Sequence, residues 1–172
     1  MYYHIMENTP AGNDGRLFVW LREAESFPPA PASDAVRDGY GSPELAVDYT
    51  GIVESSLASL YLNSQHFMAP GGELFVTGGP SGSLLVLRRV AAIFRRRTVA
   101  LSSGGAALGA AATAACLWNA RQEGDFDPDQ YCGGLLDRGS VVEPDSNDIT
   151  AFHGENGMLS RYSEVEARLV RG

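Results

Sequence analysis

Residues 73–116 constrain the fold of this chain more than any other part of its sequence. Leu74–Val76 is a short apolar run rich in strand formers, and the segment Thr77-Gly78-Gly79-Pro80 ends it abruptly. Apolar residues at helical spacing predict a helix over Leu84–Phe94, and a second strand is predicted over Thr98–Leu101. Strand, helix and strand in this order predict a right-handed β–α–β unit.

The glycine pair between strand and helix favours a ligand site. Glycine lets the backbone approach a ligand closely, and the helix that follows directs its unpaired N–H groups at that ligand. A site of nucleotide size is therefore expected here. A Walker A loop is excluded because it needs a lysine, and all thirteen basic residues of this chain are arginines.

Two other glycine loops remain possible at this point. In a dinucleotide loop, Thr77-Gly78 and Gly82 would fall at plausible spacings, but Leu84 stands where the last glycine belongs. Such loops also normally follow the first strand, whereas this one lies in the middle of the chain. The alternative is the adenosine loop of an actin-like sugar kinase, which requires no lysine.

Two glycine-rich motifs carry a more specific resemblance. Residues 76–83 read VTGGPSGS, and residues 103–111 read SGGAALGAA after the intervening helix. Together they resemble the C-terminal domain of the FGGY carbohydrate kinases, and within that family they are most similar to the xylulokinases. Members typically carry T-G-G-x-x-x-N on a strand–helix turn and S-A-A-L-G-A-A about two dozen residues later. Residues 12–29, 52–58 and 131–162 resemble the flanking family segments.

The resemblance implies an α/β fold: an actin-like, ribonuclease H-like ATPase domain with a mixed sheet flanked by helices. Residues 1–172 would then form the C-terminal nucleotide-binding domain, incomplete at its N-terminal edge and lacking the sugar-binding domain. The implied reaction transfers a phosphoryl group from ATP, with Mg²⁺, to a sugar hydroxyl. ATP or ADP would be the partner of this domain, and the sugar would bind through the missing domain.

The same resemblance assigns roles to individual residues. Gly78, Gly79 and Ser83 would hold adenosine, while Pro80 and Gly105 would shape the pocket. Ser83 stands at the position of the family asparagine, and Gly105 replaces the serine that usually precedes the A-A-L-G run. No aspartate matches the catalytic base, so no catalytic residue and no Mg²⁺ ligand is assigned to this chain, and the isolated chain is expected to be inactive.

A non-catalytic reading is the alternative. The chain would then be a nucleotide-binding or interaction domain, a truncated or degenerate kinase remnant. In either case, a domain without its leading strands is expected to expose a sheet edge, which favours pairing with a second copy as a homodimer.

Composition and charge exclude several other classes. The net charge of −8 argues against nucleic-acid binding, which needs a basic face. Residues 106–118, the most hydrophobic tract, are too few and too rich in alanine to span a bilayer, and no secretory signal is visible. A cytoplasmic protein is expected. Cys116 and Cys132 indicate no disulfide framework, and the three histidines are too isolated in sequence to predict a metal site.

The remaining elements are read from local patterns. A strand is predicted over residues 15–20, a loop over the proline-rich residues 26–33, and a helix that starts at Ser42-Pro43-Glu44 and continues to about Phe67. Small residues predict close packing of the helix after Gly105 on the sheet or on another helix. The helical pattern of residues 149–166 contains Gly154 and Gly157, which favour a kink or fraying.

Two charged features have open alternatives. Glu54 lies beside the apolar stripe of the first long helix, either as a salt-bridged boundary residue or as a polar contact in a nucleotide cleft. The arginines at 95–97 follow the C-terminus of the second helix. They either complement its dipole in solvent or contact a phosphate or another domain.

Overall fold

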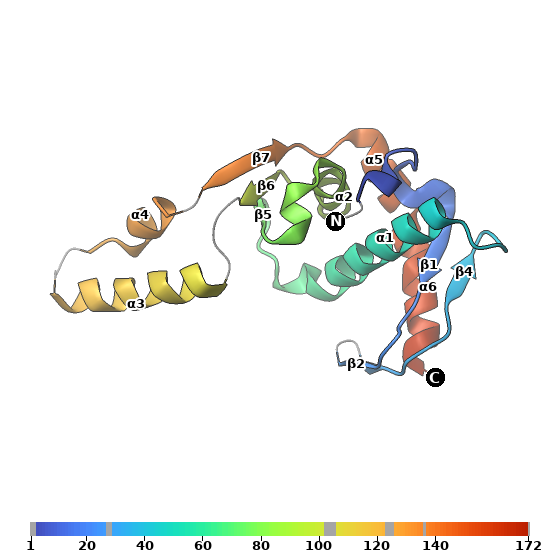
Figure 1. Cartoon of the computed structure of the whole chain (residues 1–172), viewed down its shortest axis with the longest axis horizontal. Coiled ribbons are helices and arrows are strands. Elements are labelled where there is room, and N and C mark those ends of the chain that lie inside the picture. Colours follow the sequence, from blue (N-terminus) through green and yellow to red (C-terminus); the bar gives the residue numbers. More distant parts are fainter. Residues whose placement is uncertain (1–2, 27–28, 102–105, 123–125, 136, 172) are drawn as a thin grey trace.

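A three-stranded mixed sheet lies at the centre of the long molecule in Figure 1. This computed structural model describes residues 3–26, 29–101, 106–122, 126–135 and 137–171. The strand order is β5 (Leu74–Val76), β6 (Thr98–Leu101) and β7 (Arg138–Val142). β5 and β6 are parallel, and β6 and β7 are antiparallel, so the predicted mixed α/β class is confirmed.

The β–α–β unit has the predicted bounds. After β5 the chain forms the single turn η4 (Gly79–Gly82), then α2 (Leu84–Phe94), and returns as β6. Parallel pairing of Leu74 with Thr98 and of Val76 with Ala100 requires the crossover that α2 provides. Both sides of α2 are buried, because one side packs on the sheet and the other on α1.

A second layer covers α2. α1 (Leu45–Ser64) runs beside it, followed by η3 (Gln65–Phe67), and the antiparallel pair β1 (Leu17–Val19) and β4 (Val36–Asp38) packs on α1. Gly51 permits the contact of α1 with β1, since a Cβ there would lie 2.6 Å from Cβ of Phe18. The main core gathers apolar side chains from both layers: Met6, Leu17, Val19, Ala58, Val86, Val90, Ile93, Phe94, Phe152, Met158, Leu159, Tyr162 and Val165.

Two predictions for the N-terminal half of the chain were wrong. α1 begins at Leu45 with Glu44 at the N-cap position, so the helix starts after Pro43 rather than at it. Glu44 is extended (φ −138°, ψ 118°), and no side chain caps the helix. The proline-rich segment expected to be a loop contains the two-residue strand β3 (Pro29–Ala30), which pairs with β2 (Glu25–Ser26). The short turns η1 (Tyr3–Met6) and η2 (Ala11–Gly15) precede β1.

The C-terminal helical pattern divides where its glycines predict. α5 (Ser146–His153) ends before Gly154, and α6 (Met158–Arg171) begins after Gly157. A Cβ at position 157 would lie 2.5 Å from the Phe152 carbonyl oxygen, so only glycine fits this tight connection. Asp145 caps α5 by accepting hydrogen bonds from the N–H groups of Asn147 at 2.8 Å and Asp148 at 3.1 Å.

α3 (Ala106–Gln122) and α4 (Pro128–Gly133) lie together, away from the rest of the molecule (Figure 1). The small residues of α3 were expected to pack closely on the sheet or on another helix. Most of its described side chains are instead exposed, including Trp118 at 65%, and α4 is the element packed beside it. Among the described residues, no helix is long and apolar enough to cross a membrane.

Candidate functional site

The glycine turn after β5 requires glycine at its first position. Gly78 adopts φ 79° and ψ −155°, a backbone conformation that residues with a side chain rarely reach. Its carbonyl accepts hydrogen bonds from the Ser81 hydroxyl at 2.7 Å and from the Ser81 N–H at 3.1 Å. The Ser83 N–H donates to the Pro80 carbonyl at 3.1 Å, which completes the turn.

Ser83 connects this turn to α2. Its hydroxyl oxygen accepts a hydrogen bond from the Val86 N–H at 3.4 Å, as an N-cap side chain does. The hydroxyl hydrogen is not used in that contact, so Ser83 retains one donor. The residue assigned to adenosine by resemblance therefore also holds the N-terminus of α2.

Open space surrounds the backbone of this turn. A Cβ placed on Gly78 or on Gly82 would meet no atom within 4 Å. The structure thus places Gly78, Gly79, Pro80 and Ser83 in one turn at the surface, where both glycines are exposed. Gly105, the remaining predicted site residue, lies outside the described residues.

The arginines at 95–97 belong to the opposite end of the sheet. Arg97 Nε lies 3.3 Å from a carboxylate oxygen of Glu73 and 3.3 Å from one of Glu143, and Arg96 donates to the Ala69 carbonyl. Glu73 precedes β5 and Arg97 precedes β6, whereas the glycine turn follows β5. Because the two strands are parallel, the arginines lie at their N-terminal ends and the turn lies at the C-terminal end. This placement favours intramolecular ion pairs over contact with a phosphate at the turn.

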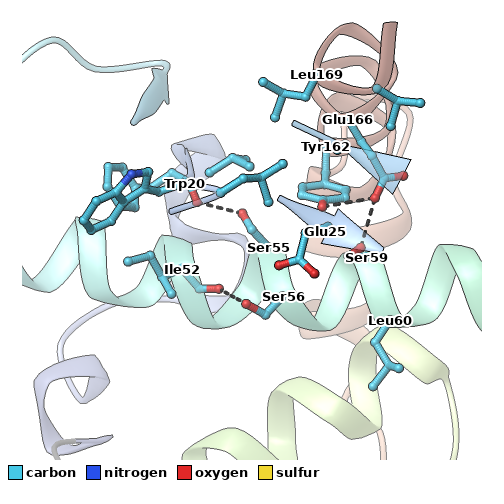
Figure 2. A pocket seen from close by; sticks show the side chains of 15 residues that line it. Trp20, Glu25, Ile52, Ser55, Ser56, Ser59, Leu60, Tyr162, Glu166 and Leu169 are labelled. Atoms are coloured by element: carbon cyan, nitrogen blue, oxygen red, sulfur yellow. Dashed lines mark hydrogen bonds between the residues drawn. The ribbon is translucent and has the colours of Figure 1, made fainter. Parts of the chain in front are cut away.

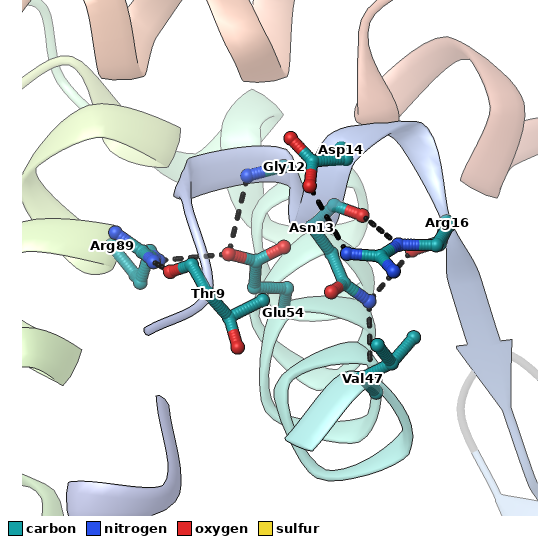
Figure 3. Close-up of polar contacts among 8 residues, drawn as sticks. All are labelled: Thr9, Gly12, Asn13, Asp14, Arg16, Val47, Glu54 and Arg89. Atoms are coloured by element: carbon teal, nitrogen blue, oxygen red, sulfur yellow. Dashed lines mark hydrogen bonds and ion pairs between the residues drawn. The ribbon is translucent and has the colours of Figure 1, made fainter. Parts of the chain in front are cut away.

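A buried polar junction joins α1, α2 and the segment before β1 (Figure 3). Glu54 has no exposed surface, so its prediction as a boundary residue was wrong although its predicted salt bridge is present. Its Oε1 accepts a hydrogen bond from the Gly12 N–H at 3.2 Å and lies 2.8 Å from Arg89 Nε. This contact is an ion pair between two buried side chains. Arg89 also donates to the Thr9 carbonyl at 2.7 Å.

Burial dominates the protonation of this junction. Desolvation raises the pKa of Glu54 to about 7, although the Arg89 charge and the Gly12 N–H both oppose that rise. Glu54 Oε2 has no hydrogen-bond partner among the described residues. Because the carboxyl group is enclosed by the chain's own residues, its role is to hold elements together rather than to contact a nucleotide.

The turn that supplies the Gly12 N–H has an unusual backbone. Gly12, Asn13, Asp14 and Gly15 all have positive φ, between 52° and 72°. Asn13 is fully buried and its amide donates to the carbonyls of Arg16 at 2.9 Å and Val47 at 3.0 Å, which ties the turn to α1. Sequence reasoning missed this turn. The signal was the run Gly-Asn-Asp-Gly, since these residue types most readily adopt the left-handed region.

Sequence reasoning also missed a cavity of about 320 Å³ between β1, α1 and α6, shown in Figure 2. Apolar groups such as Trp20 and Ile52 form part of its wall. Glu166 faces it and accepts hydrogen bonds from Ser59 at 3.0 Å and Tyr162 at 3.2 Å. Glu25 adds a second carboxylate. No residue of the glycine turn lines this cavity, and its negative charge disfavours phosphate, so it is not the predicted nucleotide site.

Comparison with known proteins identifies the fold. No protein-family model matches the sequence, and no curated protein is detectably similar to it. Among solved structures, xylulose kinase from Rhodospirillum rubrum matches 96% of this chain and 33% of its own, with 18% sequence identity and a TM-score of 0.77. Ligand-bound xylulose kinase from Lactobacillus acidophilus matches 96% of this chain and 34% of its own, at 17% identity and a TM-score of 0.75.

A gluconate kinase from Lactobacillus acidophilus matches 97% of this chain and 34% of its own, at 18% identity and a TM-score of 0.72. The chain therefore spans about a third of the length of the sugar kinases that it matches. The resemblance in fold predicted from the two glycine-rich motifs is confirmed.

Proposed function

We propose that this chain is the nucleotide-binding C-terminal part of an ATP-dependent carbohydrate kinase of the FGGY family, with the actin-like, ribonuclease H-like architecture of such domains. The observation that carries the proposal is the β5–η4–α2 turn, in a fold that matches sugar kinases over nearly the whole chain. Gly78 exposes backbone to open space at the C-terminal end of a parallel strand, where α/β sheets commonly bind ligands.

The residues of the turn have distinct roles in this proposal. The backbone at Gly78 and Gly79 would lie against adenosine, and Pro80 would hold the shape of the turn through its carbonyl contact with the Ser83 N–H. The Ser83 hydroxyl would donate a hydrogen bond to adenosine while it still caps α2. Gly105 would complete the pocket from the segment that precedes α3.

In this proposal ATP binds at the turn through its adenosine, and no Mg²⁺ ligand is assigned to the described residues. They contain no group of three or more histidine, cysteine, aspartate or glutamate side chains that is placed to hold a metal ion. In phosphoryl transfer, a carboxylate accepts the proton of the attacking hydroxyl while charge on the phosphates is compensated. We infer that the sugar pocket, this carboxylate and the Mg²⁺ ligands belong to the other two thirds of such a kinase.

A second candidate function is that of a non-catalytic interaction domain. β5 lies at the edge of the sheet, and its outer side pairs with no strand of the described residues. Phe75 in this strand is 43% exposed. An unpaired edge that carries an exposed aromatic side chain favours association with another strand, whether from a second copy or from the rest of a kinase.

Chemical-shift mapping tests the nucleotide site directly. Adenosine and ATP are titrated into the ¹⁵N-labelled chain, and shifts are expected to cluster over residues 77–84. The Gly79→Val variant should lose this response because its side chain occupies the approach to the turn. Gly41→Val is the matched control, since a Cβ at that exposed position would meet no atom within 4 Å. Shifts elsewhere, or an unchanged response of Gly79→Val, would show that the turn binds no adenosine.

An ADP-release assay tests whether the chain is active on its own. The chain alone is expected to phosphorylate no pentulose, pentose or hexose, because no residue matches the catalytic base. Sugar-dependent ADP release above background would contradict this expectation and would assign the complete reaction to these 172 residues.

A further inference from the structure

The two cysteines of the chain lie side by side in the part of the molecule formed by α3 and α4. Cys116 on α3 and Cys132 on α4 are sixteen positions apart in sequence, yet their Sγ atoms are 3.5 Å apart. Both are free thiols and both are partly exposed. They are therefore close enough to react with each other and accessible to a small oxidant.

We propose that Cys116 and Cys132 form a reversible intramolecular disulfide that joins α3 to α4. A disulfide has an S–S bond of about 2.05 Å, so the sulfur atoms must approach by roughly 1.5 Å from their present separation. Rotation about the two Cα–Cβ bonds and a small shift of the short helix α4 supply a movement of this size. No described cluster of three or more metal-ligating side chains competes for these thiols.

Disulfide exchange with a small disulfide such as oxidised glutathione supplies the chemistry. One cysteine loses its proton, and its thiolate attacks a glutathione sulfur, which releases one glutathione thiolate and leaves a mixed disulfide. The second cysteine thiolate attacks the protein sulfur of that mixed disulfide and releases the second glutathione. Two protein thiols are thereby oxidised and one glutathione disulfide is reduced to two thiols.

The environment of Cys116 affects the rate of this exchange. Desolvation and the adjoining Cys132 raise the pKa of Cys116, which keeps its thiol protonated near neutral pH. Exchange is expected to accelerate as the pH rises, because the thiolate is the reacting species.

The bond would act on a part of the molecule with few other constraints. α3 exposes most of its described side chains, including Leu117 and Trp118, and packs beside α4 (Figure 1). A covalent link between the two helices limits their separation. Oxidation is therefore expected to slow local opening of α3 and α4 and to leave α2, which lies in the core, unchanged.

The test uses the full chain in glutathione buffers of graded redox ratio, followed by alkylation and intact-mass measurement. Both thiols are expected to become resistant to alkylation while the chain stays monomeric. The mass of the chain should fall by about 2 Da because two hydrogens are removed. Reductant should restore both. Because the folded chain already holds the thiols together, half-oxidation is expected at a glutathione disulfide concentration at least about tenfold lower than in urea.

Hydrogen exchange provides a second readout. Oxidation should slow exchange about tenfold or more in peptides of α3 and α4 and leave α2 peptides unchanged. Cys116→Ser and Cys132→Ser are the matched controls, since each leaves one thiol and should give a glutathione adduct without slower exchange. Alkylation of both thiols at every redox ratio would overturn the proposal. So would separate glutathione adducts on the two cysteines, disulfide-linked dimers, or equal half-oxidation points in the folded and urea-unfolded chains.

Discussion

Glu54 on α1 and Arg89 on α2 form an ion pair inside the protein, with 2.8 Å between Glu54 Oε1 and Arg89 Nε. Both side chains are almost completely shielded from solvent. Through the Gly12 N–H and the Thr9 carbonyl, the pair also binds the segment before β1 (Figure 3). The contact of α1 with α2 thus includes a buried carboxyl group placed against a buried guanidinium group.

Removing one charge of this pair is expected to destabilise the fold strongly. Arg89→Met should lower the free energy of unfolding by about 3–5 kcal/mol, because an uncompensated carboxylate or a newly protonated one remains buried. Urea unfolding at pH 7 measures the effect. The control is Asp14, whose side chain is 64% exposed in its ion pair with Arg16, and Asp14→Asn should change stability by less than about 1 kcal/mol. An equal loss of unfolding free energy in the two variants would contradict a stabilising role of the buried pair.

The raised pKa of Glu54 predicts a pH dependence of stability. The folded-state pKa is about 7, against an ordinary value of 4.5, so between these values the folded chain holds a proton that the unfolded chain releases. This contribution is complete below pH 4.5 and is lost as the pH rises through 7, by about 3 kcal/mol. The Glu54→Gln variant, unfolded with denaturant between pH 5 and 8, should not show this loss of stability as the pH rises. A wild-type stability that changes with pH no differently from that of the variant would refute the assignment.

At acidic pH, the stability of the fold should depend on Asp48 rather than on Glu54. Arg37 lowers the pKa of Asp48, and the Tyr40 hydroxyl adds to this effect through a hydrogen bond. The sign is opposite to that of Glu54, since a carboxyl group with a lowered pKa loses its stabilisation as the pH falls through its folded value. Asp48→Asn should therefore flatten the stability profile below pH 4 and leave the profile between pH 5 and 8 unchanged. A flattening above pH 5 instead would show that the two carboxyl groups are coupled.

Ser83 gives a prediction for nucleotide affinity. Contacts mainly to base and ribose should give a Kd on the order of millimolar, about −4 kcal/mol, and adenosine and ATP should bind alike. Ser83→Asn should tighten binding by roughly 0.5–1.5 kcal/mol because the amide offers more hydrogen-bonding groups. Asparagine is as good an N-cap as serine, so α2 keeps its cap. Ser83→Ala should weaken binding and also lower stability by about 0.5–2 kcal/mol. Much tighter binding of ATP than of adenosine would indicate phosphate contacts within this chain.

The edge of β5 that pairs with no described strand predicts self-association. The chain should form dimers or larger species as its concentration rises, since an unpaired strand edge favours pairing. Phe75→Lys places a charge on this strand and should shift light scattering toward the monomer. Leu45→Lys removes an apolar side chain that is 73% exposed on a different element and serves as the control. A monodisperse monomer at high concentration would contradict the prediction.

Local sequence determined the elements around the glycine turn. The bounds of β5, α2 and β6 agree with prediction because strand formers, helical spacing and the glycine–proline segment all act within a few residues. Gly154 and Gly157 likewise predicted the division between α5 and α6. Each of these outcomes follows from the backbone conformations that residues close together in sequence prefer.

Tertiary structure alone decided the contacts between distant segments. Glu54 has the same local pattern whether it lies at a boundary or inside the core, and only the approach of Arg89 and the turn at Gly12 encloses it. The meeting of Cys116 with Cys132 likewise depends on the packing of α3 beside α4. Burial and desolvation depend on the whole fold, because they arise from groups that are far apart along the chain and become neighbours only when it is packed.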